Sequence, residues 1–402
     1  MSSIFSLFDI LAIIYLFRSV QLGLKIWREW AQIKVEPFTS HKKHLADQAS
    51  YFIAVPIGVL FHELGHVLAV WASGGQVAEF HYRAFWGYVV PIGSFTAAQN
   101  WFIAIAGTLA SLAFGLLVWL LLRRASSSTL RYFGLRAFRF QVYFSLIYYP
   151  LFTLIGFDGD WRTIYDFIAT PVLSLSTAVF HAGFLFLFWR GDRSGWFEAP
   201  SHENLAEQEQ FEQLATAAAT SPHDGQLQIQ YIDGLRRGGA KRKAQHHLTN
   251  FLAQNPDSAA AYLEMAALSS AGNRQVPKKA SESAEKALAL GLSEPRQAAF
   301  AHELVGRYKL ETGEVEAAID HFTEALDNLS GEDRSQTHLH LLRSQAYRRQ
   351  QRYEQAYQDI LIVISTAQKN GDDASLAQAQ REIETLENHA GHTLGAAYMN
   401  TP

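Results

Sequence analysis

The chain of 402 residues contains no cysteine. This absence excludes disulfide bonds, thiolate-ligated metals and cysteine nucleophiles. Charged residues are also scarce, at 18% of the chain, and the formal net charge is only -4. Such a weakly acidic chain gives no reason to expect a nucleic-acid partner. The apolar run at the N-terminus lacks a basic leader and a clear small-residue cleavage site, so an ordinary signal peptide is not expected.

Charge and aromatic residues are distributed unevenly along the chain. Residues 1–200 carry 15 Lys/Arg and 11 Asp/Glu, a net of +4, which leaves 19 and 27, a net of -8, for residues 201–402. All nine Trp lie at or before Trp196. The first half is apolar and aromatic, and the second is polar and rich in Ala, Gln and Glu. A single soluble core is therefore not expected.

The first half contains apolar stretches that are long enough to cross a bilayer as helices. A buried core helix of a soluble protein is the alternative for any one of them, but five within 190 residues favour a membrane domain. The five predicted spans are residues 4–24, 51–71, 101–122, 140–157 and 167–189. Residues 74–100 are rich in Gly and aromatic residues, and their alternation predicts short strands that pack on protein or line a cavity.

Basic residues in the connections predict a topology. Five Lys or Arg residues lie in each of two segments, 25–43 and 123–139. Arg190 and Arg193 follow the fifth predicted span. The opposite connections carry almost only Arg83 and Arg162. The positive-inside rule then predicts that the first set, and with it the C-terminal half, is cytoplasmic.

The second predicted span contains the pattern H-E-x-x-H. His62 and His66 are one helical turn apart and present their imidazoles on one face, where both can ligate Zn²⁺. Glu63 can then take a proton from a water molecule that the metal activates. Ionisable side chains are costly in an apolar stretch unless they have a function. The alternative is a polar cluster that packs between helices without a metal.

A catalytic zinc site needs a third protein ligand, and the candidates lie in the run Gly156-Phe157-Asp158-Gly159-Asp160. Asp158 follows an apolar run and precedes a Gly, so the sequence favours it as the third ligand. Asp160 could also be a ligand, a partner of a ligating histidine, or the N-cap of a following helix. For Asp166, His81 and His181 the sequence favours structural hydrogen bonds.

These two motifs together resemble the site-2 protease group of intramembrane zinc metalloproteases, an M50-like peptidase family, over about residues 50–165. The resemblance implies that His62, His66 and Asp158 bind zinc and that Glu63 is the general acid/base. Gly74-Gly75 and the strand-like stretch after it resemble the family's membrane-embedded hairpin. The chain departs from the family pattern at Thr108 and Ser111, which affects expectations about substrate handling more than about the metal site.

The resemblance also bears on topology. The family's metal lies near the cytoplasmic face, whereas the distribution of basic residues predicts that the metal end lies outside. The side of the membrane on which the C-terminal half lies is therefore left open.

The second half contains an internal repeat. Ala244, Ala280, Ala318 and Ala356 recur at steps of 36, 38 and 38 residues. The clearest unit, residues 304–326, has Gly306 and Phe322 at the small and large positions of a tetratricopeptide repeat. Four helical hairpins with a capping helix after Asp373 are predicted, and a generic helical bundle is the alternative. His246, His247, His338 and His340 are interpreted as solvated side chains.

The predicted fold is therefore all-α, a polytopic membrane helix bundle followed by a soluble α-solenoid. The predicted divisions are a membrane metalloprotease domain at 1–195, a linker at 196–224 and a repeat domain at 225–392. The predicted function is an intramembrane zinc metalloprotease in the lipid bilayer, with Zn²⁺ as cofactor and a membrane-protein substrate. The repeat domain would bind a protein or peptide partner. A non-catalytic membrane scaffold with a structural metal and an ion transporter are the alternatives.

Overall fold

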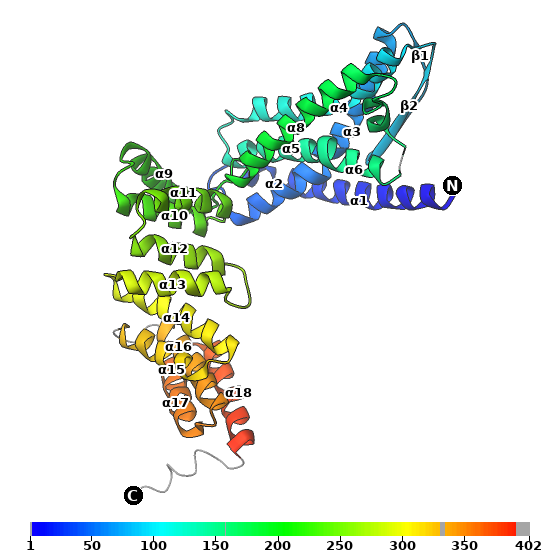
Figure 1. The fold of residues 1–402 in the computed structure, drawn as a ribbon. Helices are drawn as coiled ribbons and strands as arrows, with labels where there is room; N and C mark the ends of the chain where they lie inside the picture. Colours follow the sequence, from blue (N-terminus) through cyan, green and yellow to red (C-terminus); the bar gives the residue numbers. More distant parts are fainter. Residues whose placement is uncertain (1, 157, 330–333, 391–402) are drawn as a thin grey trace, which may run out of the picture. The chain divides into compact units, whose positions relative to one another are not determined.

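The computed structural model describes residues 2–156, 158–329 and 334–390. The chain divides into two compact units, and the first consists of residues 1–221 and 234–244. The second consists of residues 222–233 and 245–402. Most described residues are helical, and one antiparallel pair of strands lies in the first unit (Figure 1).

The elements up to residue 220 are α1 (Ser2–Ile33), α2 (Ser40–Phe52), α3 (Ala54–Ala72), β1 (Gln76–Arg83), β2 (Trp86–Ile92), α4 (Ala97–Leu122), α5 (Ser128–Tyr143), the π-helix η1 (Phe144–Tyr148), α6 (Tyr149–Leu154), α7 (Asp160–Ile164), α8 (Pro171–Arg193) and α9 (Leu205–Thr220). The elements that follow are α10 (Gly225–Arg237), α11 (Lys241–Gln254), α12 (Ala259–Ser270), α13 (Lys278–Leu290), α14 (Pro295–Thr312), α15 (Val315–Asp327), α16 (Arg334–Arg349), α17 (Tyr353–Asn370) and α18 (Asp373–Ala390). The predicted linker at 196–224 contains the helix α9.

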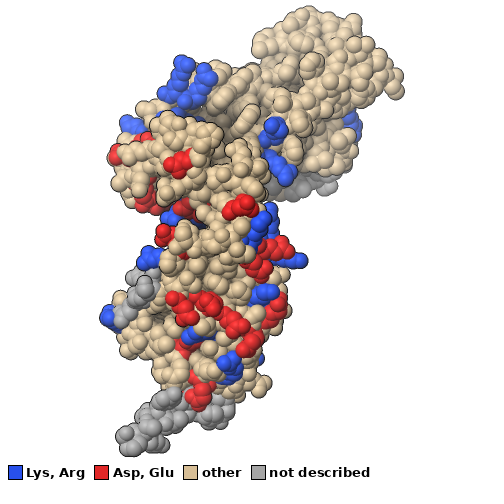
Figure 2. Space-filling view, turned by 60° about the vertical axis from the view of Figure 1, so that its left-hand side comes forward, with Lys and Arg blue, Asp and Glu red and all other residues tan. Residues whose placement is uncertain are grey.

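Three helical segments are long and apolar enough to cross a membrane, namely Ser40–Ala72, Ala97–Leu122 and Pro171–Arg193. They correspond to the second, third and fifth predicted spans, while the count of five stays a prediction. On α8 the large apolar side chains of Val172, Val179 and Phe180 are 65–79% exposed. Figure 2 shows few charged side chains on the visible face of this first unit and many more on the second. Apolar surface of this extent supports a membrane protein.

Small residues bring α3 and α4 unusually close together. A Cβ built on Gly65 would lie 2.5 Å from the carbonyl oxygen of Ala106, and one on Gly107 would lie 2.4 Å from His66 Nε2. Glycine at such positions lets apolar helices pack backbone against backbone. The contact matters for function because it brings α4 directly against the histidine-bearing face of α3.

The two strands form an antiparallel hairpin, and the alternation at 76–82 correctly predicts a strand there. His81 pairs with Tyr88, and the register shifts between Val77 and Glu79. The Tyr82 hydroxyl donates to the carbonyl oxygen of Pro56 at 2.9 Å, which ties β1 to the start of α3. The position of this hairpin in a membrane stays a prediction.

Hydrogen bonds from a lysine and an ion pair connect residues 234–244 to the rest of the first unit. Lys43 Nζ donates to the carbonyl oxygens of Ala199, at 2.7 Å, and Gly238, at 3.2 Å. Asp192 at the end of α8 accepts from Arg139 Nε at 2.7 Å and also pairs with Arg242. The segments around residues 199 and 238–242 are thus bound to side chains of α2 and α8.

Three of the four helical hairpins predicted for the second half are present in the described residues, as the pairs α12–α13, α14–α15 and α16–α17. The recurring Ala244, Ala280, Ala318 and Ala356 lie on α11, α13, α15 and α17, and each is fully buried. Gly306 on α14 faces Phe322 on α15, because a Cβ at Gly306 would lie 2.7 Å from the phenyl ring. Alternation of small and large residues therefore sets the packing within this pair, as the repeat pattern predicts. Helix α18 follows Asp372 and packs against α17.

One histidine of the second unit differs from expectation. The His340 side chain is only 12% exposed, and its Nδ1 lies 2.7 Å from the buried carboxylate of Asp359. Arg343 completes the cluster with two hydrogen bonds to the same carboxylate, at 2.8 and 2.9 Å. A buried carboxylate requires such compensation, so His340 serves packing between α16 and α17 instead of lying on a solvated face.

Replacing Gly306 with Val is expected to destabilise the α14–α15 pair, because the branched side chain would overlap the Phe322 ring. Amide hydrogen exchange of α14 and α15 in the detergent-solubilised full chain should become faster by about tenfold or more. Gly225→Val is the control, since a Cβ at Gly225 meets its nearest atom at an ordinary 3.5 Å. Equal exchange in both variants would contradict the predicted packing.

A second prediction concerns pH. His302 on α14 and His321 on α15 approach with their Nδ1 atoms 3.0 Å apart, and burial lowers the pKa of both imidazoles. The unfolded chain, with a pKa near 6.5, therefore binds protons more readily than the folded chain as pH falls. Protection of α14 and α15 should be full above about pH 6.5 and decrease below it.

The measurement is amide exchange at pH 7.5 and pH 5.5, corrected for the intrinsic exchange rate. Nearby Lys309 further lowers the pKa of His321, whereas Asp320 and Glu324 raise it. His302→Gln with His321→Gln should flatten the pH dependence. An unchanged pH dependence in that double variant would assign the effect to other groups.

Candidate metal centre

Helix α3 brings His62 and His66 together one turn apart. Their ring centroids are 4.7 Å apart in an edge-on arrangement, and their Nε2 atoms are 3.0 Å apart. His66 Nδ1 lies 2.8 Å from the carbonyl oxygen of Ile103 on α4. The second helix thus fixes the orientation of the His66 ring, which leaves its Nε2 directed at His62.

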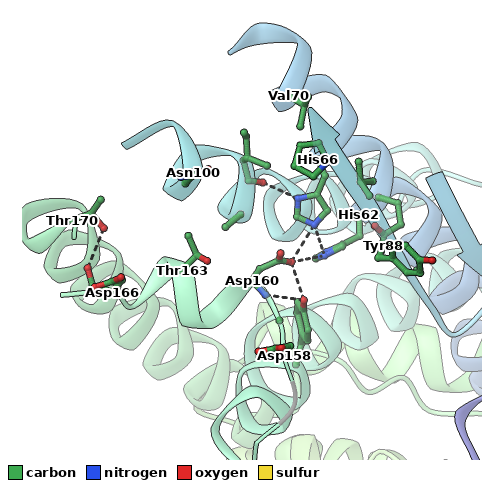
Figure 3. A pocket seen from close by; sticks show the side chains of 18 of the residues that line it. His62, His66, Val70, Tyr88, Asn100, Asp158, Asp160, Thr163, Asp166 and Thr170 are labelled. Carbon is green, nitrogen blue, oxygen red and sulfur yellow. Dashed lines mark hydrogen bonds and ion pairs between the residues drawn. The ribbon is translucent and has the colours of Figure 1, made fainter. Parts of the chain in front are cut away.

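Asp160 completes this group. Its Oδ2 atom lies 3.0 Å from His62 Nε2 and 3.1 Å from His66 Nε2. Figure 3 shows its carboxylate pointing at the two imidazoles from the start of α7. Within the described part of the chain, these three residues are the one group of three or more His, Asp or Glu that could hold a metal ion.

Asp158, which the sequence favoured as third ligand, lines the same cavity but does not join the histidine cluster. Its side chain is 92% exposed and forms an ion pair with Arg162, one helical turn further on. The structure therefore joins Asp160, and not Asp158, to the histidines. Asp160 is not the N-cap either, because Gly159 occupies that position and Asp160 is the first residue of α7. The residue beside the histidines is two positions later than the one the sequence favours, because the extended backbone at Gly159 directs Asp158 outward before α7 starts.

Tyr149 holds Asp160 in place. Its hydroxyl donates to Asp160 Oδ2 at 2.9 Å and accepts from the Asp160 backbone N–H at 3.1 Å. The Tyr149 ring also packs edge-on against His62, with centroids 5.4 Å apart. Sequence reasoning missed this residue, since a tyrosine 11 positions before an aspartate carries no recognisable spacing signal.

A π-helix precedes Tyr149, and the missing N–H of Pro150 helps to explain why the regular α-helical hydrogen bonds are interrupted there. Pro150 has no N–H, so it cannot donate to the carbonyl of Leu146 four residues earlier. His181 on α8 takes that role, with Nε2 2.8 Å from the Leu146 oxygen. Its Nδ1 then accepts from the Tyr165 hydroxyl at 2.5 Å. His181 thus makes structural hydrogen bonds, as the sequence favoured, and ties α8 to both ends of the Asp160 segment.

The other candidate polar residues lie outside the cluster. Asp166 Oδ1 accepts from the backbone N–H groups of Ile168 and Ala169 at 3.0 and 2.8 Å, which stabilises the turn before α8. His81 lies 3.0 Å from Glu79 on the exposed surface of β1. Both therefore have local structural contacts.

Glu63 is buried beside the histidines, with only 4% of its surface exposed. Its Oε2 atom has no hydrogen-bond partner among the described residues. Gly87 on β2 makes room for this side chain, because a Cβ there would lie 2.7 Å from Glu63 Cγ. A buried carboxylate oxygen without a partner is costly, which makes Glu63 a candidate functional residue.

A cavity of about 620 Å³ opens onto the cluster. It is lined by all three candidate ligands and Glu63, and by Gly87, Tyr88, Val89 and Pro91 of β2. Ala97 and Asn100 of α4 add to the wall. The sequence predicts that residues 74–100 pack on protein or line a cavity, and part of that segment lines this one.

The residues present fit a metal ion. A carbonyl oxygen only accepts, so His66 Nδ1 must carry the hydrogen in its contact with Ile103, and neutral His66 presents an Nε2 lone pair. That lone pair faces the Asp160 carboxylate and the second imidazole. Electron pairs at about 3 Å repel unless positive charge lies among them. Two imidazole nitrogens and one carboxylate oxygen, with an ordered second hydrogen bond on His66, form a typical zinc donor set.

Comparison with known proteins points to a family for part of the first unit. A family model described as Peptidase M50B-like matches residues 41–157. The match covers less than half of the chain and includes His62, Glu63 and His66. It supports a site-2 protease-like family for the first unit, and with it a protease.

Other comparisons add little. No protein with a curated description matches the chain. A solved structure titled "Crystal structure of MamA protein" is similar at 16% identity, over 44% of this chain and 96% of that one, with a TM-score of 0.29. A score this low does not establish a common fold.

Metal content should depend on Asp160 and not on Asp158. Asp160→Asn removes the charge that faces both Nε2 atoms, so the purified variant should lose bound zinc. Asp158→Asn should retain it, because that side chain is exposed and pairs with Arg162. Elemental analysis of detergent-purified protein measures both. If the Asp158 variant were the one to lose zinc, the ligand set would be reversed.

Proposed function

We propose that this chain is a multi-pass intramembrane zinc metalloprotease that hydrolyses peptide bonds of membrane-protein substrates. The observation that carries the proposal is the convergence of His62, His66 and Asp160 beside the buried Glu63, whose Oε2 has no partner among the described residues, in a cavity inside an apolar helix bundle. Catalytic zinc sites use three protein ligands and keep a position for water or substrate. A purely structural site would have no use for Glu63.

His62, His66 and Asp160 would hold the ion, with Tyr149 and the Ile103 carbonyl fixing two of them. Zinc supplies positive charge that polarises a peptide carbonyl and promotes ionisation of water. Glu63 would accept a proton from the attacking water and deliver it to the leaving amine, as a general base and then a general acid. Its burial keeps competing solvent away from the carboxylate.

The cavity wall suggests how the substrate is held. Strand β2 borders the cavity, so an extended peptide within it would lie beside strand backbone, which can donate and accept hydrogen bonds. A helical substrate hides its carbonyl groups, so it would have to unwind before cleavage. The helical hairpins of the second half, proposed as tetratricopeptide-like repeats, would recruit or regulate the substrate or another protein partner.

Glu63→Gln should abolish proteolysis while leaving zinc bound, because the amide cannot accept a proton yet is nearly the same size. The expected loss is about 10²–10⁴-fold. Membranes of cells that produce each variant would be compared by mass spectrometry of newly formed N-termini. Zinc content would be measured on the same proteins after purification.

Glu79→Gln is the matched control, since Glu79 is an exposed glutamate on β1. Fragments that form with the wild type and with Glu79→Gln, but not with Glu63→Gln, would support the proposal. If Glu63→Gln produced the same fragments, Glu63 would not be the base. A chain with zinc but without any dependent fragment would favour the membrane scaffold.

A further inference from the structure

A second cavity lies away from the metal centre, in a cleft between α1 and α2. Its volume is about 330 Å³. Four residues from each helix line it: Arg18, Gln21, Leu22 and Lys25 from α1, and His41, His44, Leu45 and Gln48 from α2. On both helices the spacing is i, i+3, i+4, i+7, which puts each set on one face. The two faces form opposite walls of one cleft.

The cleft has an apolar floor and a polar rim rich in N–H groups. Leu22 and Leu45 form the floor, and each is only 3% exposed. The other six lining residues are two permanent cations, two imidazoles and two amides. All six can donate hydrogen bonds. No acidic residue is among the lining side chains, so the cleft is chemically suited to an anion.

The two basic side chains of the cleft, Arg18 and Lys25, have no carboxylate partner among the described residues. Arg18 Nη1 lies 3.5 Å from the neutral amide oxygen of Gln21. Across the described residues, no carboxylate oxygen forms an ion pair with Arg18 or Lys25. Glu29 is the nearby acidic group, and its carboxylate lies 3.1 Å from His41 Nε2. Positive charge in a concave site with an apolar floor is less screened than on an open surface.

The surface next to the cleft indicates where the anion comes from. On α1 the apolar side chains of Ile13, Ile14 and Phe17 are 59–68% exposed, immediately before Arg18. An apolar strip that ends in cations is typical of a helix with one part against acyl chains and the other at the head groups. A guanidinium matches phosphate oxygens in a bidentate arrangement.

We propose that the cleft between α1 and α2 binds an anionic phosphate group, with Arg18 and Lys25 as the principal contacts. Its source would be an acidic membrane phospholipid or a free phosphate. This site is separate from the metal centre, and its occupancy does not depend on the proposed protease activity.

The test is lipid binding to the detergent-purified full chain, measured by native mass spectrometry. The probes are dioleoyl phosphatidate, dioleoyl phosphatidylcholine and inorganic phosphate. The wild type should bind phosphatidate in preference to phosphatidylcholine. Arg18→Gln with Lys25→Gln should bind phosphatidate roughly thirtyfold more weakly.

Arg28→Gln with Lys34→Gln is the matched control, because it removes the same charge from exposed positions outside the cleft. Arg18→Lys with Lys25→Arg keeps both charges and should retain binding if the fold is intact. Displacement of phosphatidate by millimolar inorganic phosphate would support the site and identify free phosphate as a sufficient ligand. Resistance to it, with selective phosphatidate binding, would support the lipid source.

Two results would overturn the proposal. One is an equal loss of phosphatidate in the cleft variant and the matched control, which would mean attraction to general surface charge. The other is equal binding of phosphatidate and phosphatidylcholine to the wild type without any effect of inorganic phosphate.

Discussion

The close contact between α3 and α4 is the constraint on which the candidate centre depends. Gly65 and Gly107 remove the Cβ atoms that would hold the helices apart, so the Ile103 carbonyl reaches His66. That one contact places a hydrogen on Nδ1 of His66, so a neutral imidazole presents its Nε2 lone pair to the cluster. Backbone packing between two apolar helices thus orients a candidate metal ligand, and positive charge is needed where that lone pair meets the Asp160 carboxylate.

A second chain of contacts delivers the carboxylate. Pro150 leaves the Leu146 carbonyl without its helical donor, and His181 supplies one from α8. The helix changes to a π-turn there and continues into Tyr149, whose hydroxyl fixes Asp160. The defect in the helix is therefore matched by a side chain on another helix. π-Turns are frequent at functional sites because they redirect a side chain without ending the helix.

These contacts explain how much the sequence could predict. His62, Glu63 and His66 were recognisable because four residues equal about one helical turn, which is a local rule. The helical hairpins were recognisable because Ala and Gly recur where helices touch. The choice between Asp158 and Asp160 depended on the backbone at Gly159, and Tyr149 depended on the path of the chain between two helices. Neither is encoded in a spacing, so no local pattern could identify them.

The predicted spans illustrate the same distinction. The segments around α3, α4 and α8 combine length with apolar composition, and both properties are visible in sequence. The stretch at 140–157 is apolar too, yet its described residues form parts of α5, a π-helix and α6. Buried Gln141 donates to the Ala54 carbonyl at 2.8 Å. The apolar residues of this stretch therefore pack partly against protein. Hydropathy measures only the preference for leaving water, and it does not distinguish lipid from the interior of a helix bundle.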